Sequence, residues 1–419
     1  MNDQPAKAGG KPASEEIQLS GHIIDSLVLP RAFDAIMNLG GEFDVLEFRV
    51  GKKKDETSFA RMRVTAPDAA TLDAILTQLQ ELGAELVSQK DVATSPAPRD
   101  GALPPDFYST TNLNTDVRIG GRWVRVEHPE MDVAILVDRA EKRAFTRPMV
   151  HVKQGDPVVV GHDGIRAIPL ERARESEIFS FMNSAVSSEK PKKLAIHDVA
   201  REMKAIQARG GKILVVAGPA IIHSGAGPYL GALIRAGYVH VLFGGNAIAT
   251  HDVESALLGT SLGVNLGSGL PVEGGHRHHM KALNVIRTAG SLRAAVEQGI
   301  LKRGVMYEAI QKDVTMVLAG SIRDDGPMPD VITDVLVAQD AMRAAVRGVE
   351  LALMISSMLH AIATGNLLPA FVKTVVVDIN PAVVTKLADR GSWQAVGLVT
   401  DAELFLRELC SALDVAETA

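Results

Sequence analysis

The sequence has little cysteine. Cys410 is the only cysteine in 419 residues, which excludes an intramolecular disulfide and any metal or iron–sulfur site built from several cysteines. A single thiol fits a reducing compartment, and we therefore expect a cytoplasmic protein.

Long apolar runs and blocks of like charge are also missing. Runs such as Leu351–Ile355 fall far short of the roughly 20 apolar residues that cross a bilayer. The formal charge of −6 comes from 50 acidic and 44 basic residues that are spread along the chain, and no block of one sign exceeds the three lysines at 52–54. These patterns predict a protein whose main partner is neither a membrane nor a nucleic acid.

A chain of this length is expected to hold more than one core. Residues 1–15 are polar and rich in Gly, Pro and Ala, and we expect a mobile tail there. Residues 16–100 read as strand, helix, strand, strand, helix, strand, with the second helix between Asp68 and Gly83. This order predicts a ferredoxin-like α+β domain, which serves either as a regulatory or dimerisation module or as a purely structural unit.

After the Pro-rich stretch "TSPAPRDGALPPD", the chain contains two regions with different patterns of apolar residues. Residues 101–190 hold short β-like pieces broken by Gly and Pro, which predicts a small β-rich domain, either a barrel or a sandwich. In residues 191–419, continuous Val, Ile and Leu strands alternate with Gly-rich turns and helices. This pattern predicts an α/β domain with a parallel sheet covered on both faces, and ligands bind at the carboxyl ends of such strands.

The expected strand ends carry small and polar residues, although the GxGxxG fingerprint of ordinary dinucleotide-binding folds is absent. "GPA" follows "ILVVA", "GGNA" follows "VHVLF" and "GS" follows "TMVLA". Small residues let the pyrophosphate of a cofactor approach the backbone. Asp378 closes the buried strand "TVVV", where a carboxylate commonly accepts hydrogen bonds from ribose hydroxyls. The alternative is that Asp378 caps a helix that begins at Pro381.

The segment "SIRDDGPMPDVITD" gathers Arg323, Asp324, Asp325, Asp330 and Asp334 around two prolines. Carboxylates beside an arginine can hold an amino acid by both of its charged ends, or can take a proton from an ammonium group. A solvated loop would have the same composition.

The segment "GGHRHHMKALNVIR" places His276, Arg277, His278 and His279 in succession. His276 and His279 could share a helical face as metal ligands, but the HExxH pattern is absent, and we expect no metal site. Arg277 can instead bind a carboxylate through two hydrogen bonds, while a histidine at neutral pH can give or take a proton. A polar turn without chemistry is the third reading, because Gly-Gly is itself a turn signal.

Long stretches of the chain resemble one known family. "FYSTTN", "VEHPEMDVAILVD", "GGHRHHMKALNVIR", "AGSIRDDGPMPDVITDVLVAQDAMR" and "MLHAIATGNLLPAFVKTVVVDINPAVVTKLADRGS" are similar to the archaeal-type ornithine cyclodeaminases. They are also similar to the C-terminal part of the cyanobacterial arginine dihydrolase/ornithine cyclodeaminases. The resemblance runs from about residue 16 to about residue 410. Arginine dihydrolase activity is not implied, because this chain has only a short polar segment where those enzymes carry the arginine-hydrolysing domain.

The resemblance implies an enzyme that converts L-ornithine to L-proline and ammonia with bound NAD, and we expect a homo-oligomer. It further implies a last domain similar to the NAD-binding fold of deoxyhypusine synthase, a variant of the Rossmann fold. Carried over by matching motif, the residues expected to contact NAD are Asn246, Ala247, Asp325, Ser357, Met358, Leu359, His360, Asp378 and Asp389.

The implied reaction needs a redox cofactor that returns to its original oxidation state at the end of each turnover. Hydride leaves the amine-bearing carbon for NAD⁺, the other amine attacks the imine, ammonia departs, and hydride returns to the cyclic imine. The candidate bases are Asp324, Asp325 and the three histidines at 276, 278 and 279, and Arg277 or Arg323 is the candidate carboxylate anchor. Two alternatives stay open: an NAD-dependent dehydrogenase of another amino or imino acid, and a non-catalytic protein that binds NAD or an amino acid.

Overall fold

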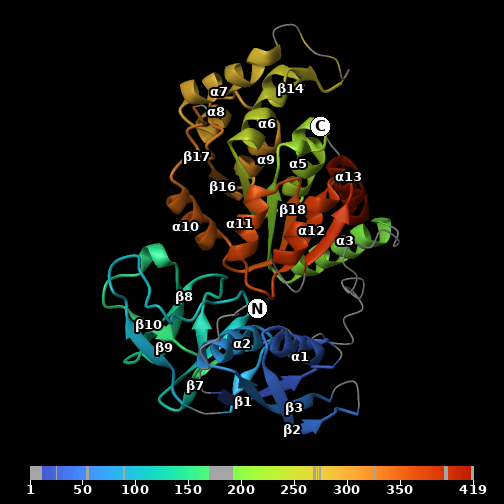
Figure 1. Ribbon diagram of the computed structural model, residues 1–419. Helices are drawn as coiled ribbons and strands as arrows, with labels where there is room; N and C mark the ends of the chain where they lie inside the picture. Colours follow the sequence, from blue (N-terminus) through green and yellow to red (C-terminus); the bar gives the residue numbers. More distant parts are fainter. Residues whose placement is uncertain are drawn as a thin grey trace, which may run out of the picture. The chain divides into compact units, whose positions relative to one another are not determined.

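The computed structural model divides the chain into two compact units, residues 1–177 and 178–419 (Figure 1). Residues 1–11, most of the predicted tail, lie outside the described residues. No helix in the described parts is long and apolar enough to cross a membrane. The structure describes residues 12–24, 26–52, 56–87, 90–168, 192–267, 270, 272, 275–324, 326–390 and 395–416.

The first sheet of unit 1 has four strands in the order β2-β3-β1-β4, and every neighbouring pair is antiparallel. Two helices fall between the strands in the order β-α-β-β-α-β, so the predicted ferredoxin-like fold is confirmed. The first strand begins at Ala13, inside the predicted tail. The elements are β1 (Ala13–Gly21), α1 (Val28–Asn38), β2 (Glu42–Arg49), β3 (Ser58–Ala66), α2 (Ala69–Glu81) and β4 (Glu85–Leu86).

Local sequence signals set the limits of helix α2. The side chain of Asp68 accepts a hydrogen bond from the Thr71 N–H at 2.8 Å, which satisfies a donor that the first turn leaves unpaired. Gly83 follows the last turn with a φ of 89°, a conformation that glycine adopts without strain. Both residues have the roles that the sequence predicts.

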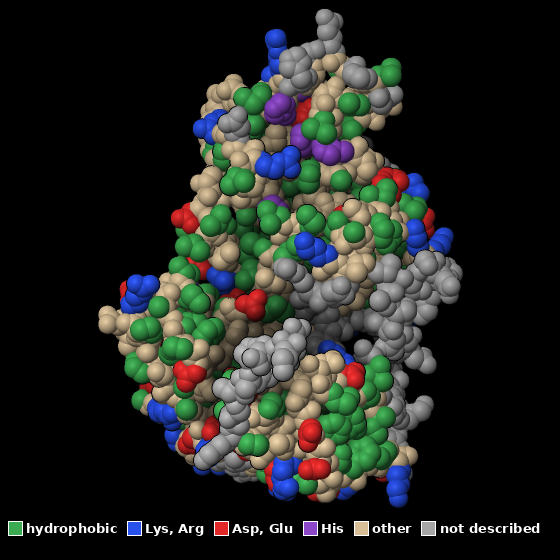
Figure 2. Space-filling model, in the orientation of Figure 1, with side chains coloured by type: hydrophobic (Ala, Val, Ile, Leu, Met, Phe, Trp, Pro, Cys, Tyr) green, Lys and Arg blue, Asp and Glu red, His purple; other side chains and the backbone are tan. Residues whose placement is uncertain are grey.

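Strand β2 forms one edge of this sheet and carries exposed apolar side chains. Val45, Phe48 and Val50 are each about half exposed, and Met37 of α1 is exposed as well. Hydrophobic side chains gather on the lower right of the face that Figure 2 shows. An open, apolar edge strand is a template for pairing with another chain.

The second sheet of unit 1 has seven strands in the order β11-β6-β7-β9-β8-β10-β5. The Val92 N–H donates to the Arg118 carbonyl at 2.9 Å and links the segment before β5 to β6, so the sheet curls back as in a small barrel. Its first strand precedes the boundary predicted near residue 100. The elements are β5 (Ala93–Pro96), β6 (Asn114–Ile119), β7 (Arg122–Glu127), β8 (Ala134–Asp138), β9 (Arg143–Arg147), a 3₁₀ turn (Met149–His151), β10 (Pro157–Val160) and β11 (Ile165–Ile168).

Unit 2 contains a parallel sheet of seven strands in the order β17-β16-β13-β12-β18-β19-β20. Counted from β12 and without the short edge strand β17, this is the Rossmann order 3-2-1-4-5-6, so the predicted α/β fold is confirmed. The likeness to deoxyhypusine synthase stays a prediction. The strands are β12 (Lys212–Ala217), β13 (Val241–Gly245), β16 (Thr315–Ala319), β17 (Val331–Ile332), β18 (Val349–Ile355), β19 (Lys373–Asp378) and β20 (Ala395–Val399).

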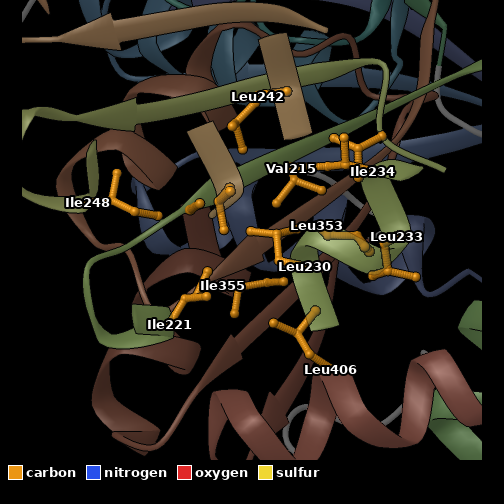
Figure 3. Packing of buried hydrophobic residues seen from close by; sticks show 14 of the residues in the cluster. Val215, Ile221, Leu230, Leu233, Ile234, Leu242, Ile248, Leu353, Ile355 and Leu406 are labelled. Atoms are coloured by element: carbon orange, nitrogen blue, oxygen red, sulfur yellow. The ribbon is translucent and has the colours of Figure 1, made fainter. Parts of the chain in front are cut away.

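Helices cover both faces of this sheet, which explains why its strands read as continuous apolar runs. Val215 and Leu353 point into the core under α3, α5 and α13, where Figure 3 shows them against Leu230 and Leu406. Neighbouring strand residues point the other way and pack against α10, α11 and α12. These helices are α3 (Lys192–Ala208), α5 (Gly227–Arg235), α10 (Val335–Ala345), α11 (Leu359–Leu367), α12 (Pro381–Arg390) and α13 (Ala402–Leu413).

A cluster of shorter elements lies at the top of unit 2 in Figure 1, where α6, α7, α8 and β14 are labelled together. Helix α6 is buried over most of its middle, where Ile248–Thr250 and Asp252–Glu254 are buried, while Ala247 and Leu258 near its ends are exposed. The elements are α4 (Ala220–His223), α6 (Asn246–Leu258), β14 (Thr260–Ser261), β15 (Val264–Asn265), a 3₁₀ turn (Gly275–Arg277), α7 (His278–Ala289), α8 (Leu292–Glu297) and α9 (Val305–Gln311).

Candidate functional site

The strand order places a switch point at the carboxyl ends of β12 and β18. The chain leaves β12 towards β13 on one side and β18 lies on the other side, and dinucleotides bind across the crevice that this reversal creates. Gly218 follows β12, and a Cβ atom added there would overlap the backbone carbonyl oxygen of Ser356, which follows β18. Only glycine therefore allows the two strand ends to approach this closely.

The turn after β13 is a second glycine turn at the same edge. Gly245 is the N-cap of α6 and has no side chain with which to cap the first turn, whose N–H groups are suited to an anion. A Cβ atom added to Gly245 would lie 2.9 Å from Cε1 of His360, whose Nε2 lies 3.2 Å from the Ala319 carbonyl oxygen. The "GGNA" turn, the end of β16 and the start of α11 therefore meet, as the predicted NAD contacts require.

Asn246 also holds the Asp-rich loop in place. Its Oδ1 accepts hydrogen bonds from the Met328 N–H at 3.1 Å and from the Thr250 hydroxyl at 3.3 Å, and its side chain is buried. The amide side chain therefore has a structural task, and a contact of Asn246 or Ala247 with NAD stays a prediction.

Asp378 ends β19 at the same edge and does not cap helix α12. Its Oδ1 accepts from the Asn380 N–H at 2.8 Å, and Asn380 Oδ1 in turn accepts from the Ala382 N–H at 3.0 Å. Asn380 is thus the residue that satisfies the first turn of α12, and the alternative of Asp378 as the cap is wrong. The ribose role of Asp378 stays a prediction.

Apolar side chains are exposed along this edge. They belong to the turns that follow β16, β18 and β19 and to the first residue of α11, whereas Ser357 after β18 is buried. Apolar side chains exposed beside a few polar groups are typical of ligand surfaces. Asp325 and the side chain of Asp389 lie outside the described residues. The exposed apolar residues are Ile322, Met358, Leu359 and Ile379.

Most acids of the Asp-rich loop have structural hydrogen bonds. Asp324 Oδ2 accepts from the Ser321 N–H at 2.7 Å and closes the turn in which Arg323 is exposed. Asp330 Oδ2 accepts from the Leu292 N–H at 2.9 Å, and Asp334 caps helix α10. These partners weaken the prediction that the loop supplies a base, and Arg323 keeps an exposed side chain suited to an anion.

The predicted histidine segment starts helix α7. Arg277 is exposed, and His278 and His279 are partly buried on the first turn of the helix. The side chain of His276 lies outside the described residues, so the alternative of a metal bound by His276 and His279 is not tested. Among the residues described, no group of three His, Cys, Asp or Glu side chains is arranged to hold a metal ion.

His278 belongs to a polar network that sequence reasoning missed. Its Nδ1 lies 2.7 Å from the Thr260 hydroxyl, which donates to Oε1 of the fully buried Glu254 at 2.9 Å. His251 Nδ1 lies 3.0 Å from the other oxygen of Glu254, and the His251 ring packs edge to face on His223 at 4.6 Å between ring centroids. Figure 2 shows histidine side chains grouped near the top of this unit.

The network favours an ionised Glu254 carboxylate and a neutral His223 imidazole. Burial raises the pKa of Glu254, but the hydrogen bonds from His251, Gly263 and Thr260 outweigh it and leave that pKa below its usual value. Burial, with the nearby His251, lowers the pKa of His223. His223 is therefore neutral at pH 7 and able to accept a proton.

Three known family models match successive parts of this chain. Residues 14–113 match the LOR/SDH bifunctional enzyme conserved region, and residues 114–196 match the first C-terminal region of ArgZ-like arginine dihydrolases. Residues 197–409 match the C-terminal Rossmann fold of the same ArgZ-like group.

Individual proteins agree with these models. The ornithine cyclodeaminase of Methanocaldococcus jannaschii is 55% identical over 408 residues, which cover 96% of each chain. The apo structure of ArgZ, a cyanobacterial arginine dihydrolase, superposes with a TM-score of 0.86 at 41% identity, over 99% of this chain and 60% of that one. The ternary complex of AgrE with ornithine and NAD⁺ gives a TM-score of 0.53 at 44% identity, over 98% of this chain and 59% of that one.

Proposed function

Because the chain belongs to the family of the archaeal ornithine cyclodeaminases, which also includes the C-terminal part of the ArgZ-like proteins, we propose that it converts L-ornithine to L-proline and ammonia. The similarity covers nearly the full length of the archaeal enzymes, and a relative binds ornithine together with NAD⁺. The observation that carries the proposal is a switch point of the Rossmann order in a unit that also holds a buried Glu–His network.

The residues at the crevice fit NAD. The glycine-containing turns after β12, β13 and β16 and the start of α6 after Gly245 suit a pyrophosphate. Within the proposal, Asp378 accepts from a ribose about three strand spacings, or roughly 14 Å, from β13. Within the proposal, Asn246, Ala247, Ser357, Met358, Leu359 and His360 line the nucleotide. NAD, when bound, supplies a hydride acceptor for the amine-bearing carbon and then a hydride donor for the cyclic imine.

The protein's own groups bind the substrate and move protons. Arg277 is exposed beside His278 at the start of α7, so it can anchor the carboxylate of an amino acid while an imidazole faces the ammonium group. The buried Glu254 keeps this part of the site polar and charged, which favours a substrate with an ammonium group.

The proposal is tested by incubating the purified protein with L-ornithine and catalytic amounts of NAD⁺. We expect proline and ammonia in equal amounts without net NADH, because the two hydride transfers cancel. If neither proline nor ammonia formed, the proposed activity would be wrong. Net NADH in a panel of other amino and imino acids would instead indicate the alternative, an ordinary dehydrogenase, and NAD binding without any turnover would indicate a non-catalytic binding protein.

We also propose that the enzyme is a cytoplasmic homo-oligomer that supplies proline. The open apolar edge of β2, with Val45 and Phe48 and with Val50 directly after the strand, supports pairing with a second copy of this chain. Burial of the single thiol, which donates to the Tyr229 carbonyl, is compatible with a reducing compartment. Light scattering measures the mass in solution, and a mass of 44.6 kDa would mean a single chain.

A further inference from the structure

We propose that Glu254 is a positioning residue that fixes His251 and His278 in the same tautomer, with the proton on Nδ1, so that each imidazole presents Nε2 as a proton acceptor. The inference deepens the proposed function, on which its catalytic part rests. It assigns the proton transfer to the histidine network rather than to the Asp-rich loop.

Glu254 is held by donors only. Its side chain has no exposed surface and accepts from the His251 ring, the Thr260 hydroxyl, and the backbone N–H groups of Leu262 at 3.3 Å and Gly263 at 3.0 Å. A buried carboxylate with four donors is stabilised in its ionised form. An ionised carboxylate has no proton to give, so each neighbour must donate to it.

This requirement fixes the tautomer of His251. Its Nδ1 lies 3.0 Å from Oε2 of Glu254, so Nδ1 carries the proton that the carboxylate accepts. In a neutral imidazole the other nitrogen, Nε2, is then unprotonated. The arrangement is the one by which a buried carboxylate orients a histidine base in hydrolytic triads.

The same requirement reaches His278 through Thr260. A hydroxyl has one hydrogen, and Thr260 gives it to Oε1 of Glu254. The contact of 2.7 Å between the Thr260 hydroxyl and His278 Nδ1 can therefore be a hydrogen bond only if Nδ1 donates. In the neutral form of this imidazole, Nε2 is then the nitrogen without a proton, and the neighbouring Arg277 can bind a carboxylate.

The network also includes His223, in the segment that follows β12. That residue ends α4, the short helix directly after β12 at the switch point, and its Nδ1 lies 2.6 Å from the Ser261 hydroxyl. Ser261 follows Thr260 in strand β14, and the His223 ring packs on His251. Three imidazoles thus lead from the first turn of α7 to α4, the helix that follows β12 in the chain.

The chemical step is a single proton transfer. The N–H bond of the substrate ammonium breaks, an N–H bond forms at Nε2 of His278, and the positive charge moves from the substrate to the imidazolium. Glu254 stabilises that charge through Thr260, and no electron is transferred in this step. The neutral amine that results can lose hydride or attack the imine.

The test compares Thr260→Val with Thr260→Ser in protein labelled with nitrogen-15 in histidine. Two-bond proton–nitrogen spectra distinguish the two tautomers, and a His278→Gln variant assigns the signals. We expect the proton on Nδ1 of His278 in the natural protein and in Thr260→Ser. We expect this preference to be lost in Thr260→Val, with a fall in kcat of about 10- to 100-fold, unchanged NAD affinity and recovery of most activity in Thr260→Ser.

A natural protein with the His278 proton on Nε2 would overturn the inference, as would a Thr260→Val variant that keeps both the natural spectrum and the natural kcat. Thermal unfolding of both variants shows whether they are folded, and Thr260→Ser preserves the hydroxyl if the valine variant is not. The spectra need no turnover. They decide the tautomers even if ornithine proves not to be the substrate, so the failure of the proposed function is distinguishable from the failure of this inference.

Discussion

Replacing Gly218 with alanine is expected to lower the free energy of unfolding of unit 2 by about 3 kcal/mol or more, and to weaken NAD binding by at least about tenfold. The added Cβ would overlap the Ser356 carbonyl and approach the Ser357 backbone nitrogen to 3.0 Å. Backbone atoms at the ends of two central parallel strands cannot rotate away as a flexible side chain would. β12 and β18 must therefore separate at the switch point, where the proposal places the cofactor. Denaturant unfolding and NAD titration measure the two effects.

Gly365→Ala is the matched control for this change. Gly365 lies within helix α11, and a Cβ atom added there has no other atom within 4 Å. Because alanine is the better helix former, this variant should gain up to about 1 kcal/mol in stability and bind NAD as the natural protein does. Equal behaviour of the two variants would contradict the assigned role of the Gly218 turn.

Replacing Glu254 with glutamine is expected to have the largest effect on turnover, a fall in kcat of about 100-fold or more. The amide lacks the negative charge and presents an NH₂ group where the carboxylate accepted hydrogen bonds, so it no longer requires His251 and Thr260 to donate. The imidazoles of His251 and His278 then lose their fixed tautomer, and the imidazolium formed during proton transfer loses the nearby negative charge of Glu254. Steady-state kinetics with L-ornithine measure the loss, and NAD affinity should stay within about threefold because Glu254 lies in α6 away from the glycine turns.

Glu297→Gln provides the control, because Glu297 is an exposed acid at the end of helix α8 in the same unit. It should leave kcat and stability unchanged, as most surface substitutions do. If Glu254→Gln retained natural turnover, or lost NAD binding in parallel with kcat, the positioning role would be wrong.

The fold could be predicted because its signals are local. Continuous apolar strands followed by small residues indicated the parallel sheet, and the cap at Asp68 with Gly83 bounded α2 correctly. The order of the strands could not be deduced in the same way, since it depends on which side of β12 each later strand joins. The switch point at β12 and β18 could therefore be located only from the three-dimensional structure.

The site was predicted less completely, for a physical reason. Counting histidines and acids along the sequence directs attention to polar loops as the site of catalysis. In the Asp-rich loop, however, Asp330 and Asp334 accept hydrogen bonds from backbone N–H groups. The Glu254 network instead brings together residues from separate segments of the chain. A signal did exist in "NAIATHDVESALLG": it carries two acids among apolar residues, and acids that such a helix buries must be paired. Asp252 accordingly accepts from two N–H groups at the start of α9, with burial raising its pKa to about 6.

The most direct test of the proposed reaction follows two labels through one turnover, in L-ornithine that carries deuterium on the α-carbon and nitrogen-15 in the α-amino group. If hydride leaves and returns to that carbon while the δ-amine closes the ring, the proline keeps deuterium on its α-carbon and has unlabelled nitrogen. The ammonia then carries nitrogen-15, and no NADH accumulates. Proline that retains nitrogen-15, loss of deuterium to water, or NADH formed in proportion to product would contradict the closed cycle.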